Sequence, residues 1–370
     1  MDLPAPPHPL ICSLPPGSLF ALFRHITCEP AELIQLALVC RSWRDIVFGT
    51  SKLWNRITIQ RKTNEKHIRK QLELSGEALL VLDLTRDTSI GPLTRLILGW
   101  NSPRLITERV NSLKATIRGE FEVDGGPAWQ LLCEGHSWPQ LKHLVLHSEC
   151  VGFRPHLLAP SLKTLHLRST EFRDWDYVHL GSALCDLRWT TNAGTVEVTA
   201  FFGATAHCPN LRRLELQVDM VDSLPHEMSL NAPLWPKLAE LDLQGGRATI
   251  ADILGLLINA PHLTSLRFLF NTLEKSDRRI SYDAKIARGL RDMSLGFLAE
   301  SHDWSRNLLR QAFLQSVINL YDPATLEKLQ LSQLPLTRCQ IPAFYPQLQE
   351  IHFIGVIVLP TSWKVSVSVH

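Results

Sequence analysis

Apolar residues recur along most of the chain in a short unit with the form Pro-x-Leu-x-x-Leu-x-Leu. Its first leucines lie at positions 141, 162, 184, 211, 238 and 263, with two later copies that begin at 326 and 348. Within each unit the pattern Leu-x-Leu predicts a β-strand whose leucines point to one side, with the intervening residues on the other. The early units are 21 to 27 residues apart, which is the period of a stacked repeat protein.

A single unit of this kind cannot bury its leucines, whereas a stack of units can. The repeats therefore predict an α/β solenoid with one strand per unit and a proline where the chain enters each strand. Helical spacing at 250–257 and 307–318 predicts helices on the convex side. The pattern is similar to leucine-rich repeats in degenerate form, because the asparagine usual after Leu-x-Leu is missing.

The first sixty residues have helical spacing instead. Leu19, Leu22, Phe23 and Ile26 lie on one face of a short predicted helix, for which Ser18 is the expected cap. Pro30 opens a second predicted helix, which ends at Gly49, and a third short element begins at Lys52. The apolar side of the second helix carries Leu33, Leu36, Ala37, Cys40, Trp43 and Val47. Three short helices make a small core, which commonly gains stability by burying its remaining apolar face in a partner.

This segment contains a distinctive series of motifs: Leu14-Pro15-Pro16, Leu19, Leu22-Phe23, the run 36–46 that includes Cys40-Arg41-Ser42-Trp43-Arg44, and Leu53-Trp54. In order and spacing these motifs resemble a fungal-type F-box. Gly17 departs from the family, which usually has glutamate there. The resemblance implies a non-catalytic protein that docks on a Skp-type adaptor of a cullin–RING ubiquitin ligase while the rest of the chain selects the target. The adaptor contacts that it implies are Leu14, Pro15, Pro16, Leu19, Phe23, Leu33, Leu36, Val39, Cys40, Trp43, Leu53 and Trp54.

Residues 60–74 predict an amphipathic helix with Ile68 and Leu72 on one side, ended by Ser75-Gly76 and followed by a buried strand over 78–84. Glutamates interleave with its basic residues, which favours a solvated helix face over a nucleic-acid patch. The expected fold class is α+β and multidomain: a small all-α three-helix module, then the solenoid. The expected organisation is a proline-rich tail at 1–9, the F-box at 10–57, a linker helix at 58–77 and the repeats at 78–370.

The residues between the strand leucines line the inner face of the predicted sheet. Aligned units place Asp186 beside Arg213 and Arg188 beside Glu215 as expected ion pairs, on a face that runs from basic to acidic. Such a face favours a partner with the opposite gradient; the alternative is a solvated polar face without a partner. The candidate target-binding residues are His143, His166, Arg168, Arg188, Arg213, Glu215, Glu240, Asp242 and Arg267. A metal site at His143, His147 and His166 lacks supporting carboxylate or cysteine ligands.

Composition removes several function classes. Lys and Arg total 38 and Asp and Glu total 36, so the net charge of +2 argues against a broad nucleic-acid surface. The eight cysteines form no C-x-x-C pair, and their apolar neighbours favour buried free thiols over disulfides. The sequence MDLPAPPHPL is unlike a secretory signal, and no apolar window is long enough to span a membrane. We therefore expect an intracellular location, cytoplasmic or nuclear.

Motifs for catalysis and cofactor binding are absent: the sequence has no G-x-S-x-G, P-loop, G-x-G-x-x-G or H-E-x-x-H. We therefore expect no cofactor and no enzymatic activity. Two hypotheses remain. The first is a substrate-recognition subunit of an SCF-type ubiquitin ligase. The second is an interaction scaffold that uses the same two modules outside any ligase.

Overall fold

The computed structural model describes the greater part of the chain in separate stretches. These are residues 14–26, 29–60, 64–86, 103–117, 137–148, 157–168, 175, 178–195, 198–219, 235–249, 257, 260–274, 289–297, 317, 325–332 and 349–354. The chain divides into two compact units, Met1–Leu144 and Val145–His370, which are described in turn. Within the described stretches, no helix combines the length and the apolar character needed to cross a membrane.

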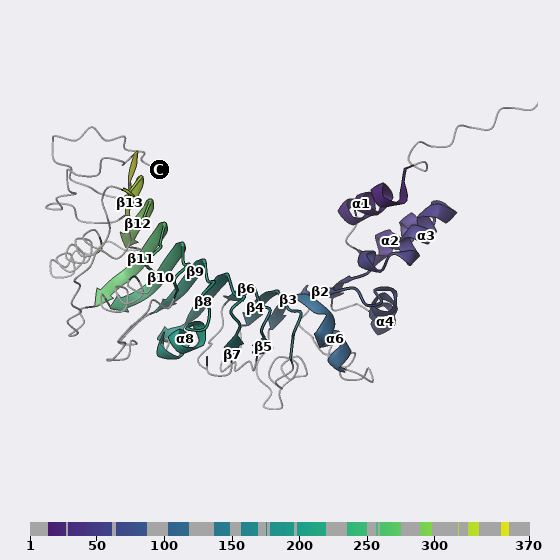
Figure 1. The fold of residues 1–370 in the computed structure, drawn as a ribbon, viewed down its shortest axis with the longest axis horizontal. Coiled ribbons are helices and arrows are strands. Elements are labelled where there is room, and N and C mark those ends of the chain that lie inside the picture. The colour runs from purple at the N-terminus through teal and green to yellow at the C-terminus, as the bar shows by residue number, and fades with distance from the viewer. Residues whose placement is uncertain are drawn as a thin grey trace, which may run out of the picture. The chain divides into compact units, whose positions relative to one another are not determined.

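The first unit begins with short helices around one small core. They are α1 (Pro16–Ile26), α2 (Pro30–Ala37), α3 (Arg41–Gly49) and the single 3-10 turn η2 (Ser51–Leu53) (Figure 1). Phe23 of α1 packs edge-to-face on Trp43 of α3, with ring centroids 4.9 Å apart. The indole N–H of Trp54 donates to the carbonyl of Val47 at 2.7 Å, which ties the residue after η2 to α3. The buried core consists of Leu19, Phe23, Leu33, Ala37, Trp43, Val47 and Trp54.

The single helix predicted from Pro30 to Gly49 is wrong, because the structure has two helices with a break between them. The amides of Leu38 and Val39 donate to carbonyls three residues back, at 3.1 and 3.2 Å, which tightens and ends α2. Cys40 is then fully extended, with φ −158° and ψ 171°, and α3 starts at Arg41. No glycine or proline marks this break, so periodicity carries no signal for it.

The predicted cap at Ser18 is also wrong. Helix α1 starts at Pro16, where the missing N–H costs nothing because the first amides of a helix have no intrahelical acceptor. The carbonyl of Pro15 accepts from Ser18 N at 3.0 Å and Leu19 N at 3.1 Å, which opens the first turn.

The rest of the first unit is β1 (Arg56–Gln60), α4 (Glu65–Leu74), β2 (Leu80–Arg86), α6 (Pro103–Arg109) and β3 (Val110–Ile117). β2 pairs in parallel with both β1 and β3. The predicted helix at 60–74 is therefore shorter at its start, because buried Ile57 and Ile59 make 56–60 a strand. Asn64 caps α4 by accepting from Lys66 N at 2.9 Å. The helix ends as predicted at Ser75-Gly76, where glycine adopts φ +50°.

The second unit is a series of parallel strands. β4 (His143–Ser148) spans the sequence boundary between the units, and the order after it is β6 (Thr164–Arg168), β8 (Asp186–Thr195), β9 (Arg213–Asp219), β10 (Glu240–Thr249), β11 (Ser265–Glu274), β12 (Asp292–Phe297), β13 (Lys328–Ser332) and β14 (Glu350–Ile354). β5 (Leu157–Ala159) and β7 (Val178–Leu180) form a separate parallel pair. Every predicted Leu-x-Leu unit is a strand, and Figure 1 shows these strands following one another in sequence order.

The register of this sheet agrees with the aligned repeats over β6 to β11. Asp186 lies opposite Thr164 and Arg213, and Glu240 lies opposite Arg213 and Ser265. The repeat pattern does not predict β12. Met293 and Leu295 alternate as in the other strands, but no Pro-x-Leu precedes them. Of the helices predicted at 250–257 and 307–318, only Leu257 and Val317 are described, and both are buried.

Aromatic residues fill the space beneath the middle strands. The rings of Trp175 lie 4.9 Å from Trp189 of β8 and 5.1 Å from Phe201 of α8 (Val198–Thr205), both edge-to-face. Trp235, in the turn before β10, lies 6.5 Å from Phe201. All four are fully buried. This aromatic packing joins α8 to the leucine side of the sheet, so the opposite face is left for polar side chains.

Two glycines of the second unit provide a test of this packing. A Cβ at Gly245 of β10 would collide with the carbonyl oxygen of Val218 and approach the ring of Phe270 to 3.1 Å, whereas a Cβ at Gly203 of α8 meets nothing within 4 Å. We expect Gly245→Ala to lower the free energy of unfolding by about 1–3 kcal/mol. Gly203→Ala should raise it by about 0.5–1 kcal/mol, because alanine favours helix. Urea unfolding of both variants checks this, and equal stabilities would contradict the packing described.

Candidate functional site

The twelve residues expected to contact an adaptor separate into two groups by burial. Leu19, Phe23, Leu33, Trp43 and Trp54 are at most 6% exposed and form the core of the helical region. Leu36, Cys40 and Leu53 are half-buried and pack against that core. These eight side chains hold the helices together. The other four are exposed: Leu14, Pro15, Pro16 and Val39.

The helical region also exposes apolar residues that lie outside the expected set of adaptor contacts. Ile34 and Leu38 are 47% and 64% exposed, next to Val39 at 54%. Ile34 and Leu38 are four residues apart and share one side of α2 and its last turn. We call Ile34, Leu38 and Val39 the α2 cluster. Leu33 and Ala37 form the buried side of α2, and Ile34 and Leu38 each follow one of them in the sequence. Apolar residues that lie outside the buried side of a helix are therefore the sequence signal that could have identified this cluster.

Phe48 is a further exposed apolar residue, on α3. Its ring is 44% exposed and stacks on Trp54 with centroids 5.8 Å apart and planes 12° from parallel. Because Trp54 is itself anchored to Val47, the orientation of Phe48 depends on the core rather than on solvent.

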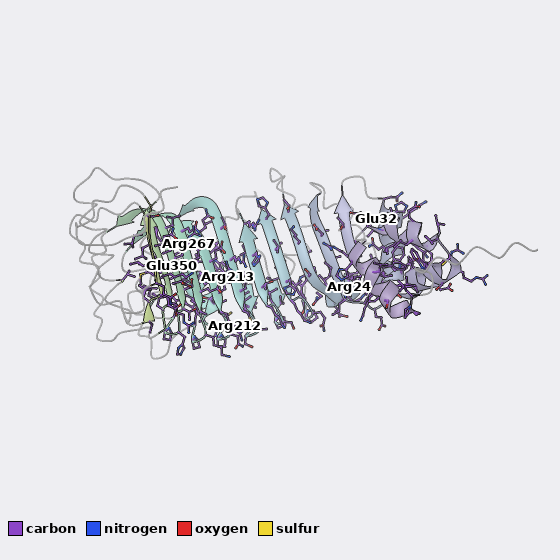
Figure 2. The ribbon with its side chains drawn as sticks, turned by 90° about the horizontal axis from the view of Figure 1, so that it is seen from above. Arg24, Glu32, Arg212, Arg213, Arg267 and Glu350 are labelled. Atoms are coloured by element: carbon purple, nitrogen blue, oxygen red, sulfur yellow. The ribbon has the colours of Figure 1, made fainter. Side chains whose placement is uncertain are left out.

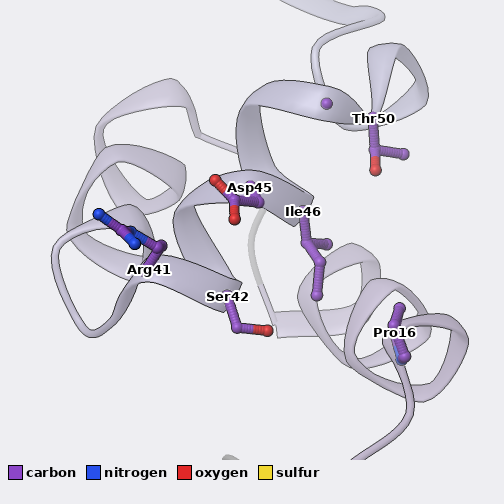
Figure 3. A pocket seen from close by; sticks show the side chains of 7 residues that line it. Pro16, Arg41, Ser42, Asp45, Ile46 and Thr50 are labelled. Atoms are coloured by element: carbon purple, nitrogen blue, oxygen red, sulfur yellow. The ribbon is translucent and has the colours of Figure 1, made fainter.

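A hollow of about 660 Å³ lies along α3 and the start of α1. Figure 3 shows Arg41, Ser42, Asp45 and Ile46 along one side of α3, with Pro16 across from them. Arg41, Ser42 and Asp45 are exposed and Ile46 is half-buried. The lining thus combines apolar Pro16 and Ile46 with the charges of Arg41 and Asp45. Such a mixture suits a protein surface better than a small apolar ligand.

The predicted target-binding residues lie mostly on the polar face of the second unit. His143 and Arg168 are exposed, on β4 and at the end of β6. We call the remaining seven, together with Asp186, the charged face: His166, Asp186, Arg188, Arg213, Glu215, Glu240, Asp242 and Arg267. Figure 2 shows Arg213 and Arg267 over the strands of this unit.

Ion pairs run along the charged face from strand to strand. Arg188 reaches Glu215 at 3.8 Å, which confirms one predicted pair. Arg213 bridges Glu215 at 3.5 Å and Glu240 at 3.4 Å, and Arg267 lies 3.5 Å from Asp242. Each of these arginines therefore has a carboxylate of this unit within 4 Å.

The predicted pair of Asp186 with Arg213 is replaced by contacts closer to Asp186. Arg188, two residues along the same strand, binds its carboxylate through two nitrogens, at 3.1 and 3.0 Å. His166 Nε2 lies 3.5 Å from the same carboxylate. A bidentate guanidinium–carboxylate pair is stronger than a single contact, so Asp186 pairs with Arg188. Arg213 pairs instead with Glu215 and Glu240.

Within the charged face, the expected passage from basic to acidic is interrupted, because both signs of charge occur on β8 and on β9. The charged-face residues of β8 and of β9 are one arginine and one carboxylate each, those of β10 are two carboxylates, and that of β11 is an arginine. The charges are interleaved and neutralise one another. Such a face selects a partner by the positions of its charges rather than by an overall gradient.

Two carboxyl groups on this face have pKa values shifted in opposite directions. Burial acts to raise the pKa of Asp186, but the contacts and charges of His166 and Arg188 outweigh it and lower the pKa to about 2. Burial raises the pKa of Asp242, and the hydrogen bond from Gln244 at 3.0 Å and the charge of Arg267 oppose this only in part. Asp186 is thus stabilised as an anion by folding, whereas Asp242 is destabilised as one.

The described cysteines Cys40, Cys185 and Cys208 are free thiols. Burial raises the pKa of Cys208 to about 12, which keeps it protonated and unreactive near neutral pH. Among the residues with described positions, no group of three or more His, Cys, Asp or Glu side chains is arranged to hold a metal ion.

Comparison with known proteins finds a family model that matches part of the chain. The family model described as F-box-like matches residues 11–60, which include α1, α2, α3, η2 and β1. No curated protein matches the chain significantly.

The opposite pKa shifts give a prediction about acid stability. Asp186 loses its stabilising contribution as the pH falls from the unfolded value near 4 through the folded pKa of about 2. We expect Asp186→Asn to lower the free energy of unfolding at pH 7 by about 1–2 kcal/mol and to flatten its decline between pH 5 and 2.

Asp242→Asn is the matched control on the same face. Because folding raises the pKa of Asp242, removing its charge should leave stability at pH 7 unchanged or higher. Urea unfolding of both variants across this pH range distinguishes them. An Asp186→Asn variant as stable as the wild type would show that its ion pairs contribute nothing.

Proposed function

We propose that this protein is a substrate-recognition subunit of an SCF-type ubiquitin ligase. In this proposal its N-terminal helical region docks on a Skp-type adaptor and its strand-rich part binds the protein to be ubiquitinated. The observation that carries the proposal is the F-box-like match at residues 11–60. The protein acts as an adaptor and contributes no catalytic group.

The exposed apolar residues of the helical region support the docking step. Small soluble modules rarely leave neighbouring large apolar side chains in water unless a partner covers them. Full burial of each such side chain is worth about 1.5–3 kcal/mol, so Ile34, Leu38 and Val39 together provide a substantial driving force. We propose that the α2 cluster contacts the adaptor together with Leu14, Pro15 and Pro16.

The buried members of the predicted contact set act indirectly in this proposal. Trp43, Phe23 and Leu33 hold α1, α2 and α3 in one arrangement. Their loss would disturb the presented surface through the fold. Leu36, Cys40 and Leu53 support it from the edge of the same core.

We further propose that the strands of the second unit form a degenerate leucine-rich-repeat solenoid. This is supported by one strand per repeat, by parallel pairing in register from β6 to β14 and by the burial of the repeat leucines. A regular sheet places outward residues at fixed spacing, which is a property of repeat proteins that recognise other proteins. The charged face is the surface that we assign to the target.

The docking step is tested with purified adaptor. We expect the triple variant Ile34→Ser, Leu38→Ser, Val39→Ser to bind a Skp-type adaptor at least tenfold more weakly than the wild type in a titration by isothermal calorimetry. Each of these side chains is more than 45% exposed in the free protein, so its replacement should leave thermal unfolding almost unchanged.

Leu79→Ser is the matched control, because Leu79 is an exposed leucine at 39% that lies outside residues 11–60. It should bind adaptor like the wild type. Wild-type affinity in the triple variant would reject the α2 cluster as the docking surface. A wild-type chain without affinity for the adaptor would reject the ligase role and favour the ligase-independent scaffold.

A further inference from the structure

The turns that lead into the strands of the second unit carry a row of basic side chains. Exposed basic or imidazole groups occur before β6, β9, β10 and β11. They are Lys163, His207, Arg212, Lys237 and His262, which we call the basic edge. Figure 2 shows Arg212 at the edge of the strands, whereas Arg267 lies over the sheet.

The basic edge has a single sign of charge. The described turns at 160–163, 181–185, 206–212, 235–239 and 260–264 contain no aspartate or glutamate. This differs from the charged face, where Arg188, Arg213 and Arg267 each have a carboxylate within 4 Å. The row ends at the next turn, where Arg291 lies 3.8 Å from Glu327.

Neutral groups hold one of these cations in place without cancelling its charge. Lys237 Nζ donates to Asn210 Oδ1 at 2.7 Å, and Asn210 Nδ2 donates to the carbonyl of Ser182 at 2.7 Å. The amide of Asn210 thus connects three consecutive turns. Lys237 is positioned by a neutral oxygen, so its charge stays available to a ligand.

The backbone beneath the basic edge is held by a ladder of hydrogen bonds. Arg212 N donates to Cys185 O at 2.8 Å, Ala239 N to Arg212 O at 2.9 Å and Thr264 N to Ala239 O at 2.8 Å. The turns are therefore ordered before any ligand arrives, which reduces the entropy lost on binding. Strands about 4.8 Å apart place the row from β6 to β11 over about 19 Å, the length of about six extended residues.

From these observations we propose that the basic edge binds a short acidic segment of a protein partner. This rests on the proposed function, because it specifies the kind of target segment that the repeat sheet would select. Carboxylates of such a segment would meet Lys163, Arg212 and Lys237, and the imidazoles of His207 and His262 would add hydrogen-bond partners.

The neighbouring charges favour a protein segment over a nucleic acid. Glu240 is 56% exposed and follows Ala239 directly at the start of β10. An uninterrupted phosphate backbone would face this carboxylate, and the net charge of the whole chain, +2, provides no broad attraction. An acidic protein segment can place neutral residues where carboxylates project.

The test uses the full-length chain and fluorescein-labelled hexaglutamate, read by fluorescence anisotropy at 25 mM NaCl. We expect saturable binding that weakens at 150 mM NaCl, and weaker or no binding of labelled hexalysine. The variant Lys163→Gln, Arg212→Gln, Lys237→Gln should lose about tenfold in affinity, equivalent to about 1.4 kcal/mol. Circular dichroism verifies that the variant is folded.

The matched control is Lys66→Gln, Arg69→Gln, Lys70→Gln on α4, which makes the same change in net charge on the first unit. It should bind hexaglutamate like the wild type. The proposal is overturned if both triple variants bind alike, if the wild type prefers hexalysine or binds neither peptide, or if hexathymidylate binds the edge more tightly than hexaglutamate. Adaptor affinity, measured separately, should be unchanged in both variants, so failure of the ligase role would be recognised independently.

Discussion

Burial of the repeat leucines is the constraint on which the second unit depends. An isolated strand would leave its leucine side chains exposed to water. Each strand is therefore stable only when neighbouring repeats cover those leucines. The parallel register from β6 to β14 satisfies this requirement strand after strand, and residues such as Leu214 and Leu241 are almost fully buried. Where the repeat is less regular, Trp175, Trp189, Phe201 and Trp235 supply the volume that leucines supply elsewhere.

The same register places the charged residues. Because side chains alternate along a strand, burying the leucines puts every intervening residue on the opposite face. The charged residues then lie at fixed spacing, and the distance that each side chain can span decides which opposite charge it contacts. Asp186 forms its ion pair with Arg188 on the same strand, and Arg213 instead bridges Glu215 and Glu240. The described turns before β6, β9, β10 and β11 contain no carboxylate, which is why the basic edge keeps its charge.

The helical region is too small to bury all of its apolar side chains. Its core of seven residues includes Phe23 and Trp43, whereas the α2 cluster stays exposed to water. The residues that are most distinctive in the sequence, such as Trp43 and Trp54, are the ones the core needs. The surface that a partner can reach is made instead by Leu38 and Val39, at the break between two helices. The F-box-like match and this exposed cluster support the same proposal from independent directions.

The sequence by itself determined the strands of the repeat units, their register over β6 to β11 and the side of the sheet that is buried. Local alternation is enough to specify these properties, because residues 165 and 167 or 214 and 216 are apolar wherever the chain lies. It also identified the helical segment and the end of α4 at Gly76. It did not locate β1, β3, β5, β7 or β12, which lack the repeat signature. Only the tertiary structure decided where one predicted helix divides at Cys40, which apolar residues stay exposed and which arginine holds Asp186. These outcomes depend on competition between neighbours in space, and a pattern along one chain does not record that competition.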